Sequence, residues 1–201
     1  MWVMGGGDDD AQDEWRRRMK PDNELPASLV LDVVLAQTPG VVISVATAQV
    51  YRNGVDLEIE IRAREDTASN GFIGEDVFVG IEFSDGRRAT NLPMWHGRTP
   101  PSRDDAVLAM GGGGGGQRSA SMRLFLTPLP SPGEMKLICA SPRRNVQETT
   151  TTLDADAIRA ASTRARELWP WEPYGEYRPP DPPPPPPGGW FEAAQGHSDA
   201  P

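Results

Sequence analysis

One segment limits the possible folds of this chain more than any other: VATAQVYRNGVDLEIEIRAR, residues 45–64. Apolar and polar side chains alternate on both sides of its Asn53-Gly54 pair, which is the pattern of strands with one buried face. The Asn-Gly pair favours a two-residue type I′ turn, because both residues adopt a positive φ readily. We therefore predict an antiparallel β-hairpin that turns at Asn53-Gly54.

That turn determines which residues of the two strands lie opposite each other. Apolar residues then face apolar residues, as a half-buried sheet requires: Val50 with Leu57, Ala48 with Ile59, and Ala46 with Ile61. The other face carries an acidic strip formed by Asp56, Glu58 and Glu60. We expect this strip to face solvent, and cation binding is the alternative interpretation.

The same alternation recurs elsewhere in the chain, and it predicts strands at 29–35, 77–83, 87–90, 122–127, 135–140 and 146–153. Asp154 is the predicted N-cap of a helix over 154–169, and Pro170 ends that helix. Short strands followed by one helix predict a mainly β fold. We expect an antiparallel β-sandwich or open barrel with one C-terminal α-helix packed on it.

Apolar residues are concentrated in the middle of the chain. Of 38 Leu, Ile, Val and Phe residues, 36 lie between Leu25 and Trp169, so the core must form there. We predict a β-sandwich domain at 25–169, between a disordered mixed-charge tail at 1–24 and an extended Pro- and aromatic-rich tail at 170–201. Within the first tail, a helix from Ala11 to Met19 is the alternative.

The charge balance argues against several classes of partner. Lys and Arg number 20 against 29 Asp and Glu, a net charge of −9, so we expect no binding to nucleic acid or membrane. The N-terminus lacks the basic and apolar regions of a secretory signal, and we expect a cytoplasmic protein. The single cysteine, Cys139, excludes an internal disulfide and is predicted to be a buried, inert thiol. We predict no cofactor and no metal, and the oligomeric state stays open.

A run of six glycines, Gly111 to Gly116, invites comparison with phosphate-binding loops. Such a loop is followed by Lys and then Ser or Thr, whereas this run is followed by Gln117-Arg118-Ser119. We therefore predict a flexible loop between strands, because glycine has little conformational preference.

The glycine run ends the longest predicted irregular stretch, 91–117, which also contains Trp95, His96 and Arg98. Long loops on a rigid sheet often carry function, so these three residues form a candidate binding site. Asp104 and Asp105 follow in the same stretch. A histidine oriented by a carboxylate is the pattern of a general base, which keeps a catalytic interpretation open.

The C-terminal tail contains large rings in a region that cannot bury them by itself. Together with its proline run, such rings suit docking into a groove of another protein, because polyproline segments lose little entropy on binding. The candidate binding residues are Trp171, Tyr174, Tyr177 and Trp190. The alternative is a stiff spacer in which Trp171 and Tyr174 fold back on the domain.

Four segments, YRNGVDLEIEIRAR, FSDGRRAT, PLPSPGEMKLICA and LDADAIRAASTRARELWP, resemble a loose group of uncharacterised bacterial β-sandwich proteins from GC-rich genomes. The resemblance covers roughly Leu29 to Pro170 and implies the same sandwich fold. The group has no assigned activity, so no residue acquires a role from it.

Two functional hypotheses follow from the sequence. The first is a non-enzymatic cytoplasmic module that binds another protein through the 91–117 stretch or the C-terminal tail. The alternative is a small hydrolase or ligand-binding enzyme that uses His96, Asp104 and Asp105.

Overall fold

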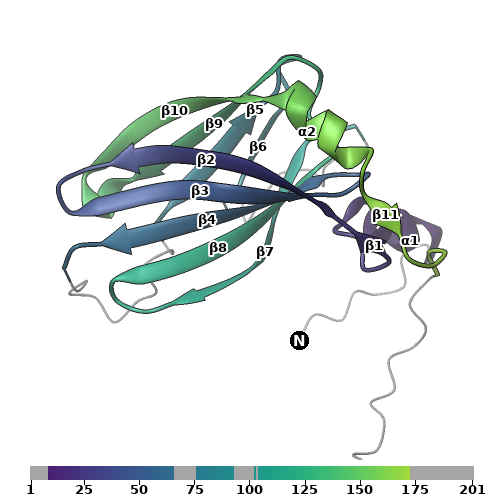
Figure 1. Ribbon diagram of the computed structural model, residues 1–201, viewed down its shortest axis with the longest axis horizontal. Helices are drawn as coiled ribbons and strands as arrows, with labels where there is room; N and C mark the ends of the chain where they lie inside the picture. The colour runs from purple at the N-terminus through teal and green to yellow at the C-terminus, as the bar shows by residue number, and fades with distance from the viewer. Residues whose placement is uncertain (1–8, 66–75, 93–101, 103, 173–201) are drawn as a thin grey trace, which may run out of the picture. The chain divides into compact units, whose positions relative to one another are not determined.

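A computed structural model describes residues 9–65, 76–92, 102 and 104–172. Among the described residues, strands account for 55% and helices for 12%, and every strand pairing found there is antiparallel. Two main sheets lie one above the other (Figure 1). The predicted fold class, a mainly β sandwich or open barrel with a C-terminal helix, is confirmed.

The larger sheet has five strands in the order β2-β3-β4-β8-β7. Their bounds are β2 Ala27–Gln37, β3 Val41–Val50, β4 Val55–Ala63, β8 Ser119–Thr127 and β7 Val107–Gly115. The smaller sheet has four strands in the order β10-β9-β5-β6. Their bounds are β10 Val146–Asp154, β9 Glu134–Ser141, β5 Phe78–Glu82 and β6 Arg88–Thr90, and a 3-10 turn, Pro142–Arg144, joins β9 to β10.

The hydrophobic core fills the space between the two sheets, because alternate residues of each strand point inward. Apart from Phe125 of β8, the largest completely buried side chains come from both sheets: Ile43, Leu57, Ile59, Ile61, Met122, Leu124 and Leu126 from the larger one, and Ile81, Met135 and Leu137 from the smaller one. Edge strands of the two sheets meet where the Thr149 hydroxyl of β10 donates to the Leu35 carbonyl of β2 at 2.7 Å. The sandwich is therefore partly closed along this side.

The predicted hairpin forms, but its turn is not the one predicted. Tyr51 N donates to Gly54 O at 2.8 Å, so the two loop residues are Arg52 and Asn53, and neither Asn53 nor Gly54 has a positive φ. Consequently Val50 lies opposite Val55 rather than Leu57.

The register of this hairpin changes once more along the strands. A bulge at Ala46 and Thr47 shifts the pairing, so that Val45 lies opposite Ile59. Val45 is buried and Ala46 is exposed, which reverses the face predicted for Ala46. A bulge of this kind is set by packing between sheets, and the alternation of side chains does not reveal it.

The three acidic residues predicted to form a solvated strip on β4 differ in their exposure. Glu58 and Glu60 are partly exposed, and Glu60 pairs with Arg62 at 2.9 Å. Asp56 is buried and pairs with Lys20, so it does not belong to a solvated strip.

Helix α2, Ala155–Ser162, begins where predicted. A carboxylate oxygen of Asp154 accepts from Asp156 N at 2.9 Å and from Ala157 N at 3.1 Å, which is the geometry of an N-cap. The helix ends at Ser162 and not at Trp169 as predicted. The residues beyond it form strand β11, Arg166–Glu167, which pairs with β1, Glu24–Leu25.

The prediction that the glycine run forms a flexible loop is wrong. Instead of a flexible loop, Gly111 to Gly115 continue strand β7 and pair with β8, with Gly113 opposite Met122 and Gly115 opposite Ala120. A Cβ at Gly113 would lie 2.6 Å from the Ser121 carbonyl oxygen. Glycine is therefore required there by the close approach of two backbones, and not by loop flexibility.

The structure describes part of the N-terminal segment, residues 9–24. Residues Asp9–Arg18 form helix α1 (Figure 1), which overlaps the helix from Ala11 to Met19 given as the alternative. The boundaries predicted for the domain and its tails stay predictions. Among the described residues, no helix has the length and apolar character needed to cross a membrane.

Candidate functional site

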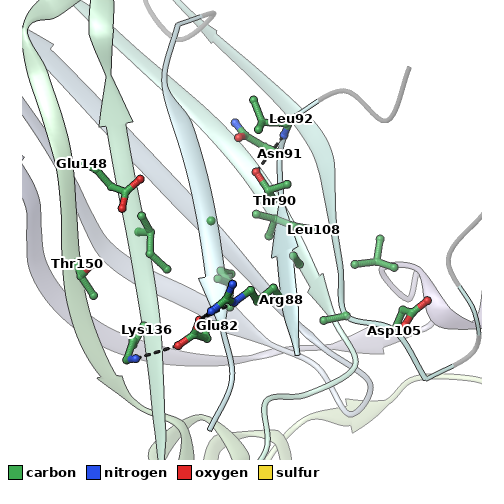
Figure 2. Close-up of a pocket in the computed structure, with 16 residues that line it drawn as sticks. Glu82, Arg88, Thr90, Asn91, Leu92, Asp105, Leu108, Lys136, Glu148 and Thr150 are labelled. Atoms are coloured by element: carbon green, nitrogen blue, oxygen red, sulfur yellow. Dashed lines mark hydrogen bonds and ion pairs between the residues drawn. The ribbon is translucent and has the colours of Figure 1, made fainter. Parts of the chain in front are cut away.

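A groove of about 1200 Å³ lies on the outward face of the four-stranded sheet. Strands β5, β6, β9 and β10 form its floor, and residues Asp105–Leu108, which include the first two residues of β7, form its wall (Figure 2). Five segments that are far apart in the sequence therefore contribute to one surface. We refer to this surface as the sheet groove.

The floor of the sheet groove follows from the alternation of side chains in β5. Val79 and Ile81 point into the core, so Gly80 and Glu82 point outward. In the pairing of the strands, Gly80 lies opposite Thr90 of β6 and Ile138 of β9. Because Gly80 has no side chain, nothing projects from the floor at this position.

A three-residue charge cluster occupies one end of the floor. The Glu82 carboxylate accepts a hydrogen bond from Lys136 Nζ at 2.9 Å and another from Arg88 Nε at 2.6 Å (Figure 2). These two hydrogen bonds hold the pKa of Glu82 below its ordinary value. Arg88 and Lys136 remain 77% and 51% exposed, so both cations also face the groove and can contact a bound molecule.

The wall is held by polar contacts at its first residues. Asp105 Oδ2 accepts from Ser102 N at 2.7 Å, and this backbone hydrogen bond is the main reason that the pKa of Asp105 is lowered. Arg87 Nη1 donates to the Asp104 carbonyl at 3.1 Å. Asp105 itself lines the groove, at the side opposite Glu148 (Figure 2).

The structure describes three of the residues that the sequence singled out as functional. Asp105 lies at the groove, Asp104 is bonded through its carbonyl to Arg87, and the Trp171 ring lies 4.3 Å from the guanidinium carbon of Arg17. The other candidates lie outside the described residues: Trp95, His96, Arg98, Tyr174, Tyr177 and Trp190. The pairing of His96 with Asp104 or Asp105 thus stays a prediction.

Sequence reasoning missed the charge cluster altogether. Glu82, Arg88 and Lys136 occupy outward positions of three predicted strands, and such positions are ordinarily solvated. One available signal was that Lys136 is one of only two lysines in the chain. Nothing in the sequence indicated that β9 pairs with β5, which is the pairing that brings the three residues together.

Two reactive groups among the described residues, the Cys139 thiol and the Glu82 carboxylate, are poorly suited to nucleophilic or acid catalysis. Cys139 is completely buried, and burial raises the pKa of its thiol to about 11, so it is not an accessible nucleophile. Glu82 is held ionised by two cations and is unsuited to donate a proton near neutral pH. No group of three His, Cys, Asp or Glu side chains suitable for a metal ion occurs among the described residues.

Neither a protein family, nor a curated protein, nor a solved structure matches the chain in comparisons with known proteins.

Proposed function

We propose that this protein is a non-enzymatic binding module that holds a segment of another protein in the sheet groove. The single observation that carries the proposal is the groove itself, with two exposed cations at one end of its floor. Carboxylates at Asp105 and Glu148 lie on its two sides. The groove therefore offers partners for both signs of charge.

Size and lining favour a polypeptide over a small molecule. A volume of about 1200 Å³ exceeds that of typical small-molecule sites, which range from about 300 to 1,000 Å³. Among the described lining residues none is aromatic, so no ring is available there to stack on a sugar or a base. Apolar contact from Ile138, beside the hydroxyl of Thr150, suits the alternating side chains of an extended chain.

The proposal is tested by filling the groove without disturbing the fold. In Gly80→Val the new Cβ lies at ordinary contact distance, 3.6 Å from the Ile138 Cβ, and the added methyl groups project from the floor. The matched control is Gly114→Val, on the other sheet, where a Cβ has no neighbour within 4 Å. We expect a partner captured by the wild-type chain to be lost by Gly80→Val and retained by Gly114→Val.

The tail is compared in the same experiment by using a chain that ends at Glu172, which keeps the contact of Trp171 with Arg17. The groove would be refuted as the binding site if the partner were lost on removal of residues 173–201 but still captured by Gly80→Val. Such a result would instead favour the aromatic and proline residues of the tail.

A further inference from the structure

The end of helix α1 is connected to the wall of the sheet groove by one side chain. Arg18 Nη1 donates to the Ser102 carbonyl at 2.7 Å, and Arg18 Nη2 donates to the Asp105 carbonyl at 2.8 Å. Both bonds join residues more than 80 positions apart in the chain. A guanidinium that bonds two carbonyls through separate nitrogens fixes their relative position, because its donors have a rigid planar geometry.

The segment that carries Arg18 is itself held on the β3–β4 hairpin. Asn53 Nδ2 lies 3.0, 3.2 and 2.9 Å from the carbonyl oxygens of residues 17, 18 and 19, where it satisfies acceptors that the end of α1 leaves free. Lys20 forms an ion pair with Asp56 of β4. We call residues 17–20 the brace, since they connect the hairpin to the groove wall.

A second arginine holds the wall from the other side. Arg87 Nη1 donates to the Asp104 carbonyl, and Arg87 is fixed in turn by Asp85 at 2.9 Å and by the Ser131 hydroxyl at 2.9 Å. Hydrogen bonds from Arg87 and Ser131 hold the pKa of Asp85 well below its ordinary value. Arg87 belongs to the turn that joins β5 to β6, whereas the brace lies between helix α1 and strand β1.

The contacts that hold the brace are polar. They include hydrogen bonds to carbonyls, one ion pair, and the placement of three cations over rings: Arg17 over Trp171, Arg18 over Trp15 and Lys20 over Tyr51. Contacts of this kind are individually modest in water, and ion pairs weaken with salt, so a segment held by them can detach without unfolding the sandwich.

We propose that the brace controls the sheet groove: when residues 17–20 are docked, Arg18 holds the wall at Asp105, and release of the brace frees the wall. This proposal rests on the proposed function only in calling the groove a binding site. The connection between brace and wall is a property of the free protein and can be measured without any partner.

The test is hydrogen–deuterium exchange on the full chain. Arg18→Gln removes the guanidinium, and Asn53→Ala releases the brace from the hairpin without altering the wall. We expect the amides of residues 105–108 to exchange about tenfold faster in both variants, the effect of losing roughly 1.4 kcal/mol of local stability. The control, Arg62→Gln, breaks an ion pair with Glu60 on β4, a strand that does not pair with β7, and should leave these amides unchanged.

Faster exchange at 105–108 in both variants, with β9 and β10 still protected, would support the proposal. Unchanged exchange at 105–108 in either variant would overturn it. The capture experiment with Gly80→Val tests the groove as a binding site and does not depend on the exchange result. The two experiments therefore distinguish an error in the proposed function from an error in the proposed role of the brace.

Discussion

At the scale of single residues, Asp56 is a buried carboxylate that depends on a nearby cation. It is 6% exposed, its Oδ2 pairs with Lys20, and its Oδ1 has no hydrogen-bond partner among the described residues. Burial by itself lowers the pKa of Lys20, but the hydrogen bond and charge of Asp56 outweigh it and raise that pKa above 10.5. A raised lysine pKa contributes stability that is present below the unfolded value and lost at more alkaline pH, so the pair persists at neutral pH.

We predict that Asp56→Asn destabilises the protein by about 1–2 kcal/mol, because it removes the charge partner of Lys20 at a buried position. The effect stays in this range since Lys20 is 38% exposed and can turn toward water. Chemical denaturation measures the free energy of unfolding. The matched control is Glu60→Gln, whose pair with Arg62 is exposed and worth about 0–0.5 kcal/mol. Equal effects of the two substitutions would contradict the account of Asp56.

At the scale of elements, the turn of the first hairpin shows how a tertiary contact replaces a local preference. Asn53-Gly54 is a favourable type I′ pair, yet Asn53 is a loop residue whose side-chain NH2 lies within hydrogen-bond distance of three carbonyl oxygens of the brace. Gly54 follows it, where a Cβ would lie 2.6 Å from the Phe125 ring. The sequence pointed to Asn53 and Gly54 because they favour a type I′ turn. In the structure their tertiary contacts, with the brace and with Phe125, explain them instead.

Strand β7 allows a comparison of two adjacent glycines. A Cβ at Gly113 collides with the β8 backbone, whereas a Cβ at Gly114 meets nothing within 4 Å. We predict that Gly113→Ala destabilises by about 1–3 kcal/mol through overpacking, while Gly114→Ala is neutral or stabilises by about 0.5 kcal/mol. Thermal or chemical unfolding distinguishes the two. If both substitutions were neutral, residues 111–115 would behave as the flexible loop that the sequence suggested.

Elements specified by neighbouring residues were predictable, and elements specified by distant ones were not. The β5–β6 hairpin and the Asp154 cap follow from alternation and capping chemistry within a few residues. The early end of α2 follows from the pairing of Arg166–Glu167 with Glu24–Leu25, a partner more than 140 positions away. Local patterns contain no information about such a pairing.

At the scale of the whole molecule, the sheet groove exists because strands from distant parts of the sequence become neighbours. Glu82 and Lys136 are 54 positions apart, and only the β5–β9 register places them side by side. The sequence singled out Asp105 as a carboxylate that could orient His96. In the structure Asp105 lines the groove, so the residue was correctly noticed, but the groove was not the reason for noticing it. Its assumed partner, His96, lies outside the described residues.

The central claim is that the sheet groove is the surface that binds a partner. The most direct measurement is hydrogen–deuterium exchange of the full chain, with and without the partner that the wild-type chain captures. We predict slower exchange at residues 78–92, 105–108, 136–138 and 148–150, which line the groove or flank its lining residues. Protection confined to β2 and β3 of the other sheet, or to residues 173–201, would contradict the claim.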